Sequence, residues 1–219
     1  STPFHSRWLN EAVYWATCFL SVREPVFNRW SHAIHHTNTK FVGTDPEIQV
    51  PRPTNLWRLA IEFLSLWHIS FHVSGMVKAT LGDMSKVARK LVPEGEVRKV
   101  VRNARWFLAG YIAVLAVAVV AESWLPILFV FFPRVFAAWI VILYTITEHA
   151  GLADNVRDHR LNTRSVLMNP VLTFLAWNAN YHIEHHMFPM VPFHALPKLS
   201  KILADQLPAP RQGLWQAWK

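Results

Sequence analysis

The sequence is poor in cysteine, and this excludes several kinds of site. Its 219 residues include a single cysteine, Cys18, so no disulfide can form within it. One thiolate also cannot replace the four that hold an iron–sulfur cluster. Cys18 lies in the apolar run WATCFL, where a thiol behaves as a small apolar side chain. Any electrons that the protein uses must therefore come from another molecule.

Acidic residues are also scarce, with 14 Asp and Glu against 22 Lys and Arg and a net charge of +8. A basic protein can bind nucleic acid or the anionic surface of a membrane. The basic residues flank apolar segments and do not accompany a nucleic-acid recognition motif. The charge pattern therefore favours a lipid surface over nucleic acid.

Apolar and aromatic residues are abundant instead. Hydrophobic residues make up 52% of the chain, with 11 Trp and 14 Phe, and the mean hydropathy is +0.17. Membrane proteins place Trp at the level of the lipid headgroups, so this composition is typical of a membrane-anchored protein. The alternative is a soluble helical enzyme with a large core.

Two apolar stretches predict a transmembrane hairpin over about residues 106–148. Residues 106–121 carry no charge, and as a helix they cover about 24 Å, near the lower limit for a span. In the second stretch, 125–147, Pro133 either kinks the helix or places the turn at 132–134. We favour the kink, because the other reading leaves a return helix of only about 22 Å.

The segments around the hairpin complete the predicted fold. We expect helices over residues 9–22 and 26–37, an ordered loop over 41–53, and an interfacial helix over 54–82. The basic segment 83–105 is expected to be solvated. Because basic residues both precede and follow the hairpin, the positive-inside rule puts both of its ends in the cytosol. The predicted fold class is all-α: an integral membrane helical domain with interfacial helices and a cytosolic histidine-rich cap.

The pattern H-x-x-H-H occurs twice, as SHAIHH at 31–36 and HIEHH at 182–186. Positions i, i+3 and i+4 share one face of a helix, so each copy fans three imidazoles over about 100°. Such fans direct nitrogen atoms at a common region where one or two metal ions can bind, and imidazole suits iron, zinc, copper and nickel. The alternative, packing alone, poorly explains two copies of one pattern. The candidate ligands of the two clusters are His32, His35, His36, His182, His185 and His186.

A seventh candidate ligand is His149, in the segment TITEHAG. It ends the second hairpin helix at the proposed cytosolic edge, where an ionisable group is a functional-site hypothesis. The alternative is an interfacial histidine that faces lipid headgroups. An all-histidine ligand set does not match the H-E-x-x-H pattern of zinc hydrolases.

Three motifs, WSHAIHHTNT, TITEHAG and NANYHIEHHMFPMVP, closely resemble histidine motifs of the membrane fatty acid desaturase superfamily. The resemblance extends over essentially all 219 residues. It implies a non-haem di-iron centre, bound mainly by histidines at the cytosolic face of a helical membrane domain. Such a centre uses dioxygen and two external electrons to attack an unactivated C–H bond.

The resemblance also implies residue roles. The six cluster histidines and His149 would be iron ligands. Some relatives hold a water-linked Asn one turn before the extra ligand, a position occupied here by Thr145. Asn178, one turn before His182, is a candidate supporting residue. Ligating imidazoles usually need a partner on their other nitrogen, and the candidate carboxylates are Glu184, Asp45, Glu47, Asp154 and Asp158. The family pattern disfavours Glu184 as a ligand itself.

The superfamily's first motif, H-x(3–4)-H, would precede this whole sequence, because relatives continue from it into a segment like STPFHSRWLN. We therefore expect an N-terminally truncated single domain over 1–219, with two ligands and a first transmembrane region upstream of Ser1. His68 and His72 form an H-x-x-x-H in the wrong order, so an interfacial role is favoured over ligation. The remaining histidines are expected to be supporting or surface groups: His5, His159 and His194.

Three functions remain open at this point. The first is a desaturase of an acyl lipid or acyl-CoA that receives electrons from ferredoxin or cytochrome b5; no cytochrome b5 motif occurs in the sequence, so the donor is separate. The second is a hydroxylase or monooxygenase of an alkane, sterol, sphingolipid or carotenoid at the same site, since the substrate channel decides the outcome. The third is an inactive fragment that binds metal weakly or not at all.

Overall fold

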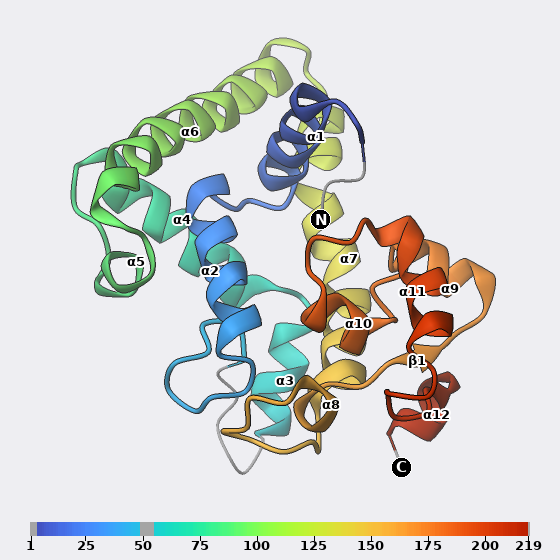
Figure 1. Cartoon of the computed structure of the whole chain (residues 1–219). Coiled ribbons are helices and arrows are strands. Elements are labelled where there is room, and N and C mark those ends of the chain that lie inside the picture. The colour runs from blue at the N-terminus through green and yellow to red at the C-terminus, as the bar shows by residue number, and fades with distance from the viewer. Residues whose placement is uncertain (1–3, 49–54, 219) are drawn as a thin grey trace. The chain divides into compact units, whose positions relative to one another are not determined.

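The computed structural model describes residues 4–48 and 55–218, and this part of the chain is mostly helical (Figure 1). Two short strands, β1 (Val166–Leu167) and β2 (Arg211–Gln212), pair in parallel. The predicted all-α fold class is confirmed. In chain order the helices are α1 (Arg7–Leu20), α2 (Pro25–Thr37), α3 (Leu56–Glu62), α4 (Leu66–Thr80), α5 (Lys86–Leu91), η1 (Glu94–Glu96), α6 (Val97–Val120), α7 (Leu125–His149), α8 (His159–Asn162), α9 (Pro170–Leu175), α10 (His182–Met187), η2 (Phe193–Ala195), α11 (Leu196–Ile202) and α12 (Gly213–Ala217).

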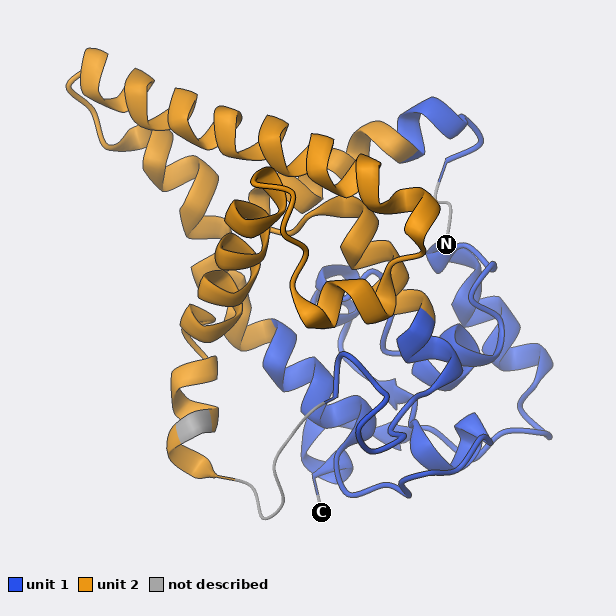
Figure 2. Ribbon diagram, turned by 90° about the vertical axis from the view of Figure 1, so that its left-hand side faces the viewer, with its two compact units in different colours: residues 1–10, 34–49, 141–219 blue, residues 11–33, 50–140 orange. Residues whose placement is uncertain are grey.

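The chain divides into two compact units (Figure 2). Unit 1 comprises residues 1–10, 34–49 and 141–219, and unit 2 comprises residues 11–33 and 50–140. The division falls within α1, within α2 and within α7, so each of these helices contributes residues to both units. Each unit is therefore built from segments that lie far apart in the sequence.

Two helices are long and apolar enough to cross a membrane, Glu94–Val120 and Leu125–His149. In their most apolar windows, 28% and 11% of the residues are buried within the protein. This low burial favours lipid-facing spans over the core helices of a soluble protein. Pro133 lies inside α7, so the prediction that this helix continues through the proline is confirmed and a turn at 132–134 is excluded.

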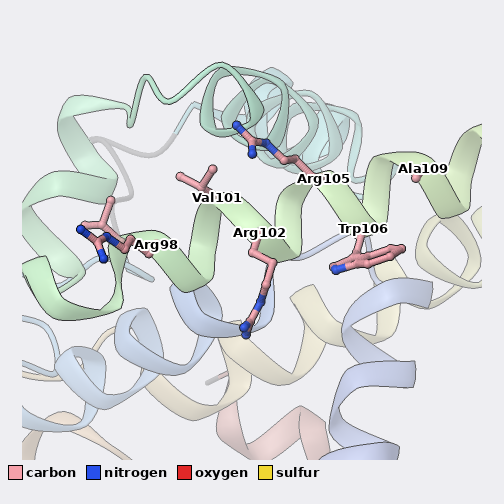
Figure 3. A pocket seen from close by; sticks show the side chains of 7 residues that line it. Arg98, Val101, Arg102, Arg105, Trp106 and Ala109 are labelled. Carbon is pink, nitrogen blue, oxygen red and sulfur yellow. The ribbon is translucent and has the colours of Figure 1, made fainter.

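The basic segment before the first span is part of the span's own helix, because α6 starts at Val97. Arg98, Arg102 and Arg105 follow successive turns of α6 along a shallow cavity of about 590 Å³ (Figure 3). Trp106, which is 67% exposed, comes next. Arginine and tryptophan at the end of an apolar helix are typical of the membrane–water interface.

The core of unit 2 forms where α1 packs against α6. The Phe107 ring meets Trp15 and Phe19 edge-on, with ring centroids 5.6 and 5.3 Å apart. Phe19 also stacks on Tyr111, with centroids 4.5 Å apart. A Cβ atom at Gly110 would lie 2.9 Å from the Phe19 ring, so this close approach requires glycine.

A buried carboxylate, Glu24, joins the start of α2 to α6. It accepts hydrogen bonds from the backbone N–H groups of Val26 and Phe27 and from the side-chain amide of Asn103, at 3.1, 2.6 and 2.9 Å. Burial raises the pKa of Glu24, although these hydrogen bonds oppose the effect. The carboxylate replaces the missing acceptors at the first turn of α2.

The segment predicted as one interfacial helix is two helices, α3 and α4. They are separated at Ser65, whose backbone is left-handed with a φ of 56°, a conformation that interrupts a right-handed helix. His68 lies on α4 with its Nδ1 2.7 Å from Glu62 Oε2. Of the predicted loop 41–53, residues 41–48 form turns, and 49–53 lie outside the described residues.

Candidate metal centre

Three helices bring four buried histidines together in unit 1. His35 comes from the C-terminal part of α2, His149 is the last residue of α7, and α10 carries His182 and His186. One ring nitrogen from each histidine lies within 4.8 Å of the corresponding atom of every other. All four side chains are buried. We call these residues the four-histidine cluster.

The closest approaches in the four-histidine cluster are between Nε2 atoms. His182 Nε2 lies 2.9 Å from His149 Nε2 and 3.1 Å from His186 Nε2. The ring of His35 is 5.3 Å from that of His149 and 5.0 Å from that of His186, centroid to centroid. Ligand atoms bound to one ion at about 2.1 Å are about 3.0–3.4 Å apart, so the spacing suits a shared metal.

The second ring nitrogen of each histidine has a partner that fixes the position of its proton. His149 Nδ1 faces the carbonyl oxygen of Asn162 at 3.2 Å, and His182 Nδ1 faces that of Ala179 at 3.1 Å. Carbonyl oxygens only accept hydrogen bonds, so both Nδ1 atoms carry the proton. Their Nε2 atoms are therefore left with free lone pairs.

His186 and His35 are held in the same way. The Thr39 hydroxyl donates its proton to the carbonyl of His35 at 2.7 Å, so it accepts from His186 Nδ1 at 3.1 Å. His35 Nδ1 lies 3.0 and 3.1 Å from the two oxygens of Asp45. Burial alone would raise the pKa of this carboxyl, but the hydrogen bond and charge of His35 lower it. Asp45 is therefore an ionised acceptor.

The lone pairs that meet in this cluster fit a metal ion. Nε2 lone pairs about 3 Å apart repel one another unless a cation lies between them, and this donor set suits a divalent transition metal. Burial, and then the neighbouring histidines, lower the pKa of both His182 and His186 below the usual value. The rings therefore stay neutral, which is the form that binds metal.

The other predicted histidine ligands lie beside this cluster or on its helices. The His36 ring is 4.6 Å from that of His185 and stacks on that of His186 at 4.3 Å. His32 is exposed and precedes His36 by one turn of α2, on the same face of that helix. Within unit 1, His36 and His185 thus form a second pair next to the four-histidine cluster.

The predicted supporting residues differ in their placement. Thr145 is exposed, and its hydroxyl donates to the carbonyl of Val141 at 3.0 Å. Asn178 is half-buried in the turn before α10, with a φ of 55°. Glu184 is 2% exposed and accepts a hydrogen bond from the Ser165 hydroxyl at 2.5 Å. Glu184 thus ties α10 to the start of β1.

Among the other candidate carboxylates, Asp45 contacts the four-histidine cluster through the ring of His35. Asp154 pairs with Lys40 at 3.3 Å. Asp158 caps α8 and pairs with Arg160 at 2.7 Å. The backbone N–H of Glu47 donates to Asp45 at 2.9 Å, so Glu47 contributes through its main chain.

The histidines outside the motifs differ in their burial and in the unit to which they belong. The His159 ring lies 5.1 Å from that of His186, and its buried Nδ1 has no hydrogen-bond partner among the described residues. Burial lowers the pKa of His159. His5 and His194 are exposed. His68 and His72 lie on α4 in unit 2, apart in the chain from the residues of the four-histidine cluster.

Two buried ionisable residues that contact residues of the four-histidine cluster were not predicted from the sequence. The Lys40 ammonium donates to the carbonyls of His149, at 2.9 Å, and Leu152. Glu148 is 7% exposed, with its Oε2 3.4 Å from His182 Nε2. For Glu148 a signal was present, since an acidic residue at the end of an apolar stretch is unusual. Lys40 follows the first cluster in a polar run and carried no such signal.

These features define a helical protein with two candidate membrane spans and a buried, metal-compatible histidine cluster. The family model for fatty acid desaturase matches residues 1–218. The chain therefore belongs to the fatty acid desaturase family, as its motifs predict. No curated protein matches the sequence.

Proposed function

We propose that the protein is an O2-dependent di-iron desaturase that introduces a double bond into a fatty acyl chain. Membership of the fatty acid desaturase family indicates an oxidoreductase of lipid metabolism. The observation that carries the proposal is the four-histidine cluster, whose Nε2 lone pairs approach within 2.9 and 3.1 Å. This arrangement of buried lone pairs is costly without a cation.

The proposed ligands divide into two sets, one for each of two iron ions. The four-histidine cluster would hold one ion, and His36, His185 and His32 would hold the other. When bound, the iron pair supplies the activation of dioxygen and the oxidation of the C–H bonds. The protein contributes by holding neutral imidazoles in place and by keeping bulk water away from the buried ring nitrogens.

The membrane arrangement is part of the same proposal. We place α6 and α7 across the bilayer and the histidines on the cytosolic side, where a separate donor such as ferredoxin or cytochrome b5 can deliver electrons. Basic residues at 98–105 and 157–164 support this orientation by the positive-inside rule. The substrate would be an acyl lipid or acyl-CoA, whose chain the apolar helices position against the iron pair.

Product analysis tests the function. The protein is expressed in a host that supplies acyl lipids and electrons, under ¹⁸O2, with His182→Ala as the inactive variant and exposed His194→Ala as its control. A desaturase yields a lipid lighter by two hydrogens and free of ¹⁸O. An ¹⁸O atom retained in the product would instead identify the hydroxylase alternative. If the chain has bound iron and still forms no product, both the desaturase and the hydroxylase hypotheses are contradicted.

A further inference from the structure

Glu148 is a buried carboxylate to which the proposed reaction gives no role. Its residue is 7% exposed, and within the described part of the chain no lysine or arginine forms an ion pair with it. A buried carboxylate without a cation is unfavourable. The Glu148 carboxylate faces the imidazole of His182, whose Nε2 lies 3.4 Å from Glu148 Oε2.

The proton assignment of His182 decides what this contact means. Because His182 Nδ1 donates to the Ala179 carbonyl, Nε2 offers a lone pair and not a hydrogen. An ionised Glu148 oxygen is also an acceptor. A cation between the two atoms stabilises an ionised oxygen that faces this lone pair at 3.4 Å, whereas a protonated Glu148 would donate its hydrogen to Nε2. This separation lies at the upper end of the range of about 3.0–3.4 Å between ligand atoms that share one ion.

The position of Glu148 on α7 explains how it reaches the cluster. Glu148 and His149 are the last two residues of the helix, and adjacent helical side chains diverge by about 100°. Both nevertheless approach the same atom, since His149 Nε2 lies 2.9 Å from His182 Nε2. The end of α7 thus presents one nitrogen and one oxygen donor within 3.4 Å of His182 Nε2.

We propose that Glu148 is a carboxylate ligand of the metal ion held by the four-histidine cluster. This inference rests on the proposed function only in that the cluster must bind a metal. The ion then has a mixed donor set of imidazole nitrogen and carboxylate oxygen. Carboxylate oxygen favours harder ions such as Mn²⁺, and imidazole nitrogen suits Fe, Zn and Cu. The mixed set therefore shifts selectivity towards harder ions.

The test is an anaerobic titration of the purified chain in detergent with Co²⁺, followed by its visible absorption. Glu148→Gln keeps the size and hydrogen-bonding capacity of the side chain but removes the anionic ligand. We expect its Co²⁺ affinity to fall by about tenfold or more and its absorption at saturation to change shape. Glu24→Gln, an equally buried position in unit 2 (4% exposed), is the matched control and should behave as wild type.

The outcomes are distinguishable. A Glu148→Gln variant with wild-type affinity and absorption would overturn the inference but leave the metal centre intact. A wild-type chain that binds no Co²⁺ would overturn the metal centre itself. If Glu148→Gln does not fold, the infrared difference spectrum of wild type with and without Zn²⁺ decides. Carboxylate bands that shift on binding support ligation, and unchanged carboxylate bands contradict it.

Discussion

Asp45 determines the orientation of the His35 ring and is itself fixed by the main chain. It accepts hydrogen bonds from the backbone N–H groups of Lys40, Glu47 and Ile48 at 2.8–3.1 Å, in addition to its contact with His35. Because these donors fix the carboxylate in place, it also restricts the rotation of the His35 ring. His35 is therefore preorganised before a metal binds.

Replacing Asp45 should weaken metal binding more than it weakens the fold. We expect Asp45→Asn to lower metal affinity about 10- to 100-fold, as for other residues that orient ligating histidines. Competition with a chromophoric chelator measures this affinity. Asp158→Asn, at the exposed cap of α8, is the control and should retain wild-type affinity. Equal losses in the two variants would contradict the role of Asp45.

The lowered pKa of Asp45 also predicts how its contribution to stability varies with pH. A folded-state pKa below the unfolded value of about 3.9 means that ionised Asp45 stabilises the fold above that pH. The contribution is lost as the pH falls from about 4 through the lower folded-state pKa. The difference in unfolding free energy between wild type and Asp45→Asn should thus be constant at neutral pH and shrink below about pH 4. A difference that grows with acidity would contradict the assignment.

At the scale of helices, the sequence predicted the positions of the histidines better than it predicted the residues that hydrogen-bond their rings. The i, i+3, i+4 pattern correctly placed the candidate ligands on helices, because that spacing is local. Thr39 holds the ring of His186, 147 residues away, and Asn162 holds that of His149, 13 residues away, so no pattern within one helix marks them. Ser65 breaks the predicted interfacial helix through its backbone conformation, for which serine gives no sequence signal. The basic residues after Val97 proved helical because α6 continues through them.

Lys40 fixes the C-terminal end of α7. It is 4% exposed, and its ammonium donates to the carbonyl of His149, the last residue of the helix, and pairs with Asp154 at 3.3 Å. We expect Lys40→Met to lower the unfolding free energy by about 2 kcal/mol or more, because it leaves buried acceptors without a donor. Denaturation followed by circular dichroism measures the change. Lys99→Met, which removes a surface pair with Glu96, should cost about 0–1 kcal/mol.

Two helical glycines form a matched pair for testing the packing of α1 on α6. A Cβ atom added at Gly75 would meet no other side chain within 4 Å, whereas one added at Gly110 would lie 2.9 Å from the Phe19 ring. We expect Gly75→Ala to raise the melting temperature, since alanine favours helix by about 1 kcal/mol. Gly110→Ala should lack this gain, because overpacking costs about 1–3 kcal/mol. Equal shifts in both variants would show that the contact with Phe19 does not constrain α6.

At the scale of the whole molecule, the proposed orientation predicts which residues a membrane-impermeant reagent reaches. Cys18 is 3% exposed, so a Cys18→Ala background is a suitable starting point. In intact cells, a cysteine at exposed Ala121, between the two spans, should react with an impermeant maleimide added outside. A cysteine at exposed Arg98 should react only after the cells are permeabilised. The reverse pattern would contradict the cytosolic placement of the histidines.

The interleaving of the two units has a consequence for biosynthesis. His35 and His36 leave the ribosome about 150 residues before His182 and His186, and the intervening chain includes both candidate spans. At about 5–20 residues per second, His35 and His36 are synthesised on the order of 8–30 seconds before His182 and His186. Under the proposed function, iron loading would therefore be a late event, which would follow insertion of α6 and α7 and depend on a cellular iron supply after translation is nearly complete.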